Sequence, residues 1–232
     1  MEFTLQNLTF EHWPVYDETV TNAEPNGRSM AVSRRPAADA LTIDRVLDAA
    51  EQELRRFGSA KTTVVDVARK LGVSHAAVYR YVSTKAELRS AVVDRWLTRL
   101  FLPLEAVATS DRPAMSRLRQ WLETLIAAKR KNLRDDPEMF ELYSQLAVTA
   151  PTVVNDQLNR LVTQLEVILS SGKESGSIDC ENAADAARAV LSATSRFHHP
   201  GHAPEWSDPA IDARFEAVWT LIVTGLRRRV EP

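Results

Sequence analysis

Cysteine, glycine and long apolar runs are all scarce in this chain of 232 residues. The single cysteine, Cys180, can form no internal disulfide, and only seven residues are glycine, so the composition is not that of a disulfide-stapled or low-complexity protein. No apolar run approaches the roughly 20 residues that a membrane-spanning helix needs, and the first residues lack the features of a secretion signal. We therefore expect a soluble, cytoplasmic protein.

The motifs of the common enzyme classes are also missing. The sequence has no glycine-rich phosphate loop, no nucleophile elbow and no pair of carboxylates at a recognisable spacing, and these patterns carry most hydrolytic and phosphoryl-transfer chemistry. We expect a protein that is not an enzyme and has no cofactor. A small metalloenzyme built on histidines, with Glu205 or Asp208 as acid–base partner, is the alternative in the enzyme class.

Positive charge is concentrated in one part of a chain whose net charge is −2. Residues 1–30 carry one basic and five acidic side chains, residues 31–100 carry 13 and 8, and the remainder carries 15 and 18. A localised excess of positive charge is what a module that faces phosphates needs, although a solvated helical surface is equally compatible with it.

The first residues show neither a helical nor a strand period, so residues 1–36 are predicted to be a flexible leader. Met30 begins a second stretch that contains Arg34 and Arg35, and translation from Met30 is a second hypothesis beside translation from Met1.

Apolar residues at helical spacing, with capping residues between them, predict four helices in the next part of the chain. Gly58 is expected to end the first helix in a left-handed cap, and Gly72 to end the second. The predicted helices are 42–58, 63–72, capped by Thr63 with Asp66, 74–81, capped by Ser74, and 84–100, capped by Thr84 with Glu87.

Helical periodicity continues after residue 100, in segments that we expect to break near Pro103, Pro113, Pro137, Pro151 and two polar stretches. Five or six helices fit there, and no alternating run is long enough for a sheet. The predicted fold class is therefore all-α, with an N-terminal three-helix helix-turn-helix DNA-binding domain at 37–84 and a C-terminal helical bundle at 85–232.

The second and third helices resemble the DNA-binding helix-turn-helix of the TetR family of one-component regulators. The resemblance is dense over residues 57–93 and departs from the family at Ala76, often glycine, and at Val82, often phenylalanine. The matching motifs are Thr62 and Thr63; Asp66, Val67 and Ala68; Gly72, Val73 and Ser74; Val78, Tyr79, Arg80, Tyr81 and Val82; and then Lys85 and Leu88.

The resemblance implies roles for the residues at these positions. Base edges should meet His75, Ala76 and Ala77, with Ser74 capping the recognition helix and Arg80 adding a groove or phosphate contact. Phosphates should be held by Thr63, Tyr79, Tyr81 and Lys85, although packing against the first helix is the alternative for both tyrosines.

A homodimer and a small-molecule effector are further expectations from the resemblance. The dimer interface is expected on two apolar faces, unless both belong to the core of one protomer: Ala183, Ala187, Val190, Leu191 and Thr194, with Phe215, Val218, Trp219, Ile222 and Leu226. The candidate effector pocket, whose residues fit a plain core equally well, comprises Trp121, Met139, Phe140, Tyr143, Phe197 and His198.

Three of the five histidines, His198, His199 and His202, lie in one proline-bounded segment. They are consistent with a structural loop, which we favour, with contact to an anionic effector, or with a metal site that includes Glu205. We expect no bound metal.

The function predicted from the sequence is therefore a repressor that an effector releases from a palindromic operator in double-stranded DNA. A structural protein that binds DNA without sequence preference is the alternative. Because two alanines flank His75, much of the specificity is expected from thymine methyl contacts and DNA shape, with Arg34 and Arg35 as minor-groove or backbone arms.

Overall fold

Helices form all of the regular secondary structure in residues 40–227, the part of the chain that this computed structural model describes, with side chains excepted at 151–153. The all-α prediction is therefore confirmed. The predicted leader 1–36, with Arg34 and Arg35, and residues 37–39 lie outside the described residues. The helices in chain order are α1 (Ile43–Lys61), α2 (Val64–Leu71), α3 (His75–Tyr79), α4 (Lys85–Ala108), α5 (Ala114–Asp135), α6 (Pro137–Thr149), α7 (Pro151–Glu174), α8 (Ala183–Ala193), the 3₁₀ helices η2 (Ser195–Phe197) and η3 (Pro200–Ser207), and α9 (Ile211–Leu226).

The predicted helix starts are found where capping residues mark them. The hydroxyls of Thr42, Thr63, Ser74 and Thr84 each accept a hydrogen bond from the backbone amide three residues later. These bonds satisfy amides that the first turn of a helix leaves without partners. The starts of α1, α2, α3 and α4 therefore follow from local sequence.

Two predicted helix ends are wrong, and a third has the right place but another geometry. The regular helix of α1 is interrupted at Gly58, whose φ 77° and ψ 163° lie outside the left-handed helical region of the predicted cap, and a helical stretch resumes up to Lys61. The third helix ends at Tyr79, and the chain turns before Tyr81. The helix α4 runs through Pro103 to Ala108, and its packing against α5 and α7 holds the two sides of the proline together.

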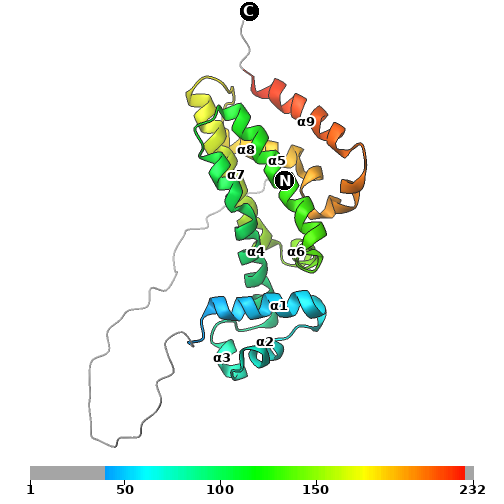
Figure 1. Cartoon of the computed structure of the whole chain (residues 1–232). Coiled ribbons are helices and arrows are strands. Elements are labelled where there is room, and N and C mark those ends of the chain that lie inside the picture. The colour runs from blue at the N-terminus through cyan, green and yellow to red at the C-terminus, as the bar shows by residue number, and fades with distance from the viewer. Residues whose placement is uncertain (1–39, 228–232) are drawn as a thin grey trace, which may run out of the picture. The chain divides into compact units, whose positions relative to one another are not determined.

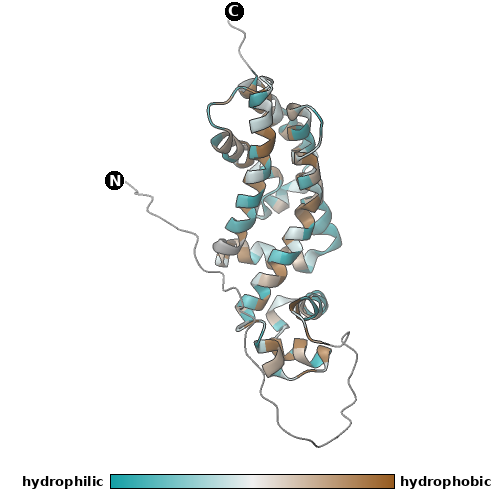
Figure 2. Ribbon diagram, turned by 90° about the vertical axis from the view of Figure 1, so that its left-hand side faces the viewer, coloured by the Kyte–Doolittle hydropathy of each residue, from teal (hydrophilic) through white to brown (hydrophobic). Residues whose placement is uncertain are grey.

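The helix α4 connects the N-terminal group of helices, α1 to α3, with the larger helical bundle (Figure 1). Its first turns pack with α1, and its remainder packs against α5 and α7 in the larger bundle, where α8 lies on α7 and α6 contacts α1, α4, α5 and α7. Apolar segments alternate with polar ones along the long helices (Figure 2), and the apolar side chains of α1 through α9 form one continuous core.

The helix α9 lies at the edge of the bundle and joins it through η3 (Figure 1). Its Phe215 and Leu226 are buried in the protomer, whereas Leu221 is 73% exposed. Among the described helices, none is long and apolar enough to cross a membrane.

Candidate nucleic-acid interface and interior ligand site

The turn between α2 and α3 is held by its backbone. Gly72 ends α2 in the left-handed conformation, φ 67° and ψ 30°, and the amide of Val73 donates to the carbonyl of Ala68 at 3.1 Å. Thr63 and Asp66 exchange hydrogen bonds in both directions, so the capping box predicted for α2 is present. These bonds set the angle at which α3 leaves α2.

The apolar side chains of this helix pair lie inside the protein. Val67 and Val78 are fully buried, and Leu71 and Val73 pack against the same core. Val82, at the position where the family often has phenylalanine, is also buried. The smaller side chain therefore keeps its place in the core.

The opposite face of α3 is open. His75, Ala76, Tyr79 and Arg80 are exposed and Ala77 is half-buried. His75 and Arg80 make no hydrogen bond with any described residue, so their donors are available to another molecule. The predicted base-reading residues thus come together on one exposed surface.

Three of the predicted phosphate-binding side chains already have partners within the chain. The hydroxyl of Thr63 donates to the carboxylate of Asp66 at 2.6 Å, that of Tyr81 donates to the carbonyl of Leu41, and the ammonium of Lys85 donates to the carbonyl of Ala60 at 2.9 Å. The bond of Tyr81 matches the packing alternative, because it joins the end of α3 to the start of α1. Lys85 keeps two further donors.

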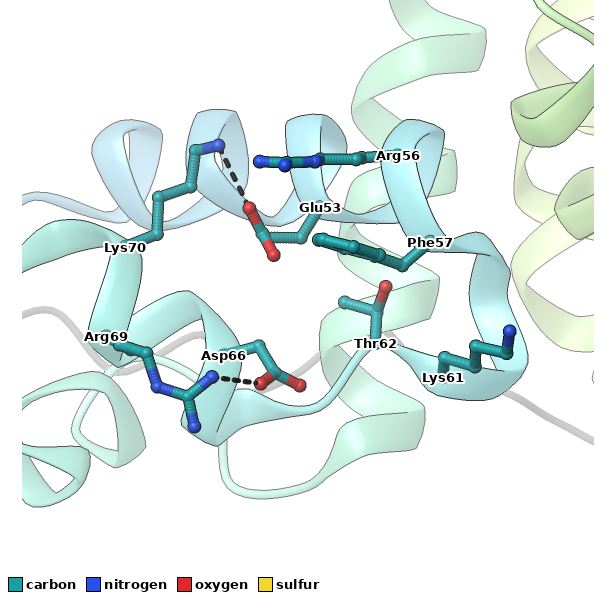
Figure 3. Close-up of a pocket in the computed structure, with 8 residues that line it drawn as sticks. All are labelled: Glu53, Arg56, Phe57, Lys61, Thr62, Asp66, Arg69 and Lys70. Atoms are coloured by element: carbon teal, nitrogen blue, oxygen red, sulfur yellow. Dashed lines mark hydrogen bonds and ion pairs between the residues drawn. The ribbon is translucent and has the colours of Figure 1, made fainter.

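A groove between α1 and α2, of about 520 Å³, was not anticipated from the sequence. Figure 3 shows Lys70 reaching from α2 to Glu53 in α1, and Arg69 pairing with Asp66. The guanidinium of Arg56 lies 4.9 Å from the ring centroid of the exposed Phe57. The contact between Lys70 and Glu53 ties the first two helices together and so helps to hold the recognition helix in place.

The six side chains predicted for the effector pocket are all buried in the bundle. Phe140 makes edge-to-face contacts with Tyr143 at 5.9 Å and Trp206 at 5.8 Å, whereas Phe197 contacts Phe215 at 5.4 Å. The indole of Trp121 donates to Gln164 at 2.9 Å. The six therefore lie in one core but in separate ring clusters, and the sequence could not have grouped them.

Lys129 in α5 was missed by the sequence analysis. The lysine is 2% exposed, with its Nζ 4.0 Å from the ring centroid of Tyr143 and 5.0 Å from that of Phe101. Burial lowers the pKa of Lys129 to about 7. The signal was present in the sequence, since Lys129 follows Leu125 by four positions on the apolar face of its helix.

The three clustered histidines have separate partners. Nε2 of His198 lies 3.3 Å from the Thr194 hydroxyl, His199 accepts from the Gly201 amide at 3.1 Å, and Nδ1 of His202 lies 2.8 Å from Glu205. Burial, and then the charge of Lys129, lower the pKa of His198 to about 3. Within residues 40–227 no three His, Cys, Asp or Glu side chains are grouped so as to hold a metal ion, and the partners support the structural-loop interpretation.

A carboxylate at the junction of α5 and α6 connects the bundle to α1. Asp136 accepts two hydrogen bonds from Arg55, at 3.0 and 2.9 Å, and one from the indole of Trp96 at 3.1 Å. Gln145 in α6 adds a second connection, because its Oε1 accepts from Ser59 and from Arg89. A displacement of α6 would therefore also displace α1, the helix against which α2 packs.

Two family models match the chain. Residues 46–92 match the model described as bacterial regulatory proteins, tetR family, and residues 114–219 match the tetracyclin repressor-like, C-terminal domain. Together the two matches cover about two thirds of the chain.

Curated relatives match the chain over limited lengths. The nucleoid occlusion factor SlmA of Haemophilus influenzae is 29% identical over 75 residues, which are 32% of this chain and 34% of that protein. An HTH-type transcriptional regulator of Mycobacterium tuberculosis is 38% identical over 60 residues, 26% of this chain and 30% of the relative. The chain thus spans about a third of the length of these relatives.

Solved structures share the fold over most of their length. SmeT, the repressor of the Stenotrophomonas maltophilia multidrug efflux pump SmeDEF, has a TM-score of 0.58 at 18% identity, covering 83% of this chain and 93% of SmeT. FadR from Bacillus subtilis, solved in complex with stearoyl-CoA, has a TM-score of 0.58 at 17% identity, covering 79% and 99%.

Proposed function

The chain belongs to the TetR family of bacterial regulatory proteins, and from this premise we propose that it is a DNA-binding transcriptional regulator released from its operator by a small-molecule effector. The exposed face of α3 carries this proposal. His75 and Arg80 stand there without partners among the described residues, on a helix whose direction is set by the Gly72 turn. Short helices of this kind read base edges in the major groove.

Within this function, Ser74 caps the recognition helix while His75, Ala76 and Ala77 face bases. Tyr79 and Arg80, both exposed, meet the groove wall or its phosphates. Thr63, Tyr81 and Lys85 can bind phosphates only by exchanging their present partners or by sharing a donor. The single hydroxyl proton of Tyr81 is already donated to Leu41, so the phosphate-binding role has the least support for Tyr81.

The active species is a homodimer in this proposal, because one recognition helix reads too few base pairs for a specific address. The α8 face that was predicted for the dimer interface is mostly buried within the protomer, at Ala187, Val190, Leu191 and Thr194. The exposed Leu221, with the half-buried Val218 and Ile222 beside it on α9, is the face left for a partner.

The effector acts from the helical bundle in this proposal. The structures of SmeT with triclosan and of FadR with stearoyl-CoA are examples of this fold holding small molecules. The bonds from Asp136 and Gln145 to α1 give an occupied bundle a path to the recognition helices. An effector lowers operator affinity only to the extent that it prefers the conformation that does not fit DNA.

Selection of bound sequences from a random DNA pool, with the full chain, tests the proposed function. We expect a palindrome whose half-sites are separated by about one helical turn or a multiple of it. Recovery of unrelated sequences with equal affinity would instead identify a DNA-binding protein without sequence preference.

The His75→Ala variant tests the reading role of α3. Loss of a base contact should weaken operator binding by roughly 1–3 kcal/mol and leave random DNA unaffected. The matched control is His199→Ala, an exposed histidine of the bundle, which should leave both affinities unchanged. Equal losses on operator and random DNA for His75→Ala would refute the assigned role.

A further inference from the structure

Lys129 presents a buried ammonium group with no counter-ion. Its Nζ lies over the ring faces of Tyr143 and Phe101, and it makes no hydrogen bond or ion pair with a described residue. Buried charges in proteins are normally paired, because a lone ion loses its hydration without compensation. The site therefore lacks an anion.

Tyr143 places a second donor beside this ammonium. Its side chain is 4% exposed, and its hydroxyl makes no hydrogen bond with a described residue. A tyrosine hydroxyl in a protein interior usually finds a partner. The ammonium from α5 thus faces the ring of a tyrosine from α6 whose own hydroxyl donates to no described residue.

The surroundings of these donors are apolar and aromatic. The ring of Phe101 flanks the ammonium, and Phe140 and Trp96 lie against the ring of Tyr143 at 5.9 and 6.0 Å. The nearby His198 is neutral at physiological pH because burial holds its pKa at about 3. The site thus offers one positive charge within an apolar enclosure.

Phe101 connects this site to a groove on the surface. The ring contacts Lys129 and also lines a hollow of about 80 Å³ between α4 and α7. That hollow shares Glu105, Arg160 and Gln164 with a groove of about 430 Å³ between the same helices. In the hollow, Oε1 of the buried Gln157 has no hydrogen-bond partner.

We propose that Lys129 and Tyr143 bind the carboxylate of the effector, and that the effector is an amphiphile with one carboxylate and an apolar body lying in the groove between α4 and α7. This inference rests on the proposed function and names the ligand class. A carboxylate forms an ion pair with the ammonium and accepts a hydrogen bond from the tyrosine hydroxyl. The surrounding aromatic rings contact the apolar atoms next to the carboxylate. The ring of Phe101 turns aside to admit the ligand, since the hollow is too small for it as it stands.

The test uses the full chain and matched probes: hexanoate, decanoate, hexadecanoate, benzoate and naphthoate, each beside the alcohol of the same skeleton. Binding is measured by calorimetry and by the fluorescence of the buried tryptophans Trp96, Trp121 and Trp206. At least one carboxylate should bind saturably and at least about tenfold more tightly than its alcohol. Failure of every carboxylate to bind, or alcohols binding equally well, would overturn the proposal.

Three variants assign the binding to the proposed site. Lys129→Met should weaken carboxylate binding by at least about tenfold and spare the alcohol, and Tyr143→Phe should weaken it by several-fold. Lys131→Met, an exposed lysine of the same helix, is the matched control and should bind as the unaltered chain does. Unchanged carboxylate binding by Lys129→Met would refute the assignment.

The pH dependence supplies an independent signature. The titratable groups that face Lys129 are Tyr143, His198 and His199; of these, His198 stays neutral and burial raises the pKa of the Tyr143 hydroxyl. Carboxylate affinity should therefore fall by up to about tenfold per pH unit above pH 7, as Lys129 deprotonates. In Lys129→Met the affinity should be independent of pH over that range.

Operator binding, measured on the same variants without probes, separates this inference from the proposed function. Lys129→Met should bind operator as the unaltered chain does, because Lys129 lies away from the recognition helix. Retained operator specificity with no carboxylate response would leave the regulator standing and reject only the ligand class.

Discussion

At Lys129, a single side chain lowers the stability of the whole fold. Its pKa falls from 10.5 to about 7 on burial, which corresponds to a cost on the order of 5 kcal/mol when the ammonium is charged. The unfolded chain binds the additional proton between these pH values, so this group makes stability rise with pH from about 7 to 10.5 and adds nothing beyond.

Replacing Lys129 with methionine should therefore stabilise the protein. We expect the free energy of unfolding in urea to rise by about 2–5 kcal/mol at pH 6.5, because methionine fills a similar volume without a charge. The gain should shrink toward zero as the pH approaches 10.5. An equal gain at every pH would show that packing, and not the ammonium, is responsible. Such stabilisation on removing a polar group is common at sites kept for function.

At the scale of helices, Asp136 joins three elements through one carboxylate. Arg55 from α1 and Trp96 from α4 both donate to it, at the point where α5 passes into α6. The hydrogen bonds to Asp136 raise the pKa of Arg55. This junction lies seven residues after Lys129 and seven before Tyr143. The helices α5 and α6, which carry the two donors of the proposed anion site, therefore meet at Asp136.

The Asp136→Asn variant should lose stability, because an amide cannot accept the two-pronged guanidinium contact and the indole bond together. We expect the free energy of unfolding to fall by about 1–3 kcal/mol in guanidinium chloride. Its neighbour provides the control: Asp135 forms an ion pair with the exposed Lys131, and Asp135→Asn should change stability by less than about 0.5 kcal/mol. Equal losses of stability in the two variants would show that Asp136 does not hold α1 to the bundle.

For the whole molecule, the exposed face of α9 is the dimer interface that we propose. A charge placed at Leu221, which is 73% exposed, should disrupt a dimer that buries this face and leave the protomer folded. We expect Leu221→Glu to raise the dimer dissociation constant by at least about tenfold in sedimentation velocity, with a parallel loss of operator affinity. Val148→Glu, at an 81% exposed position of α6, is the control; an unaltered dimer in Leu221→Glu would place the interface elsewhere.

Local chemistry explains which parts of the structure were predictable. The helix starts at Thr42, Thr63 and Thr84 depend on a hydroxyl and an amide three residues apart, and so they were found correctly. The continuation of α4 through Pro103 was not predicted, because it depends on the packing of α4 against α5 and α7, which outweighs the backbone hydrogen bond that the proline removes. The extension of α1 past Gly58 likewise uses a backbone conformation that glycine permits but does not specify.

The sequence by itself determined the helix-turn-helix: its caps, its apolar core and the polar residues left on the face of α3 all follow from spacings within about 20 residues of chain. Only the tertiary structure decided what surrounds a side chain from distant segments. In the folded chain the hydroxyl of Tyr81 donates to the carbonyl of Leu41, and the predicted pocket residues lie in separate clusters. Lys129 lies between rings from α4 and α6. Burial and partnership depend on which helices meet, and a helical period indicates only that a face is covered.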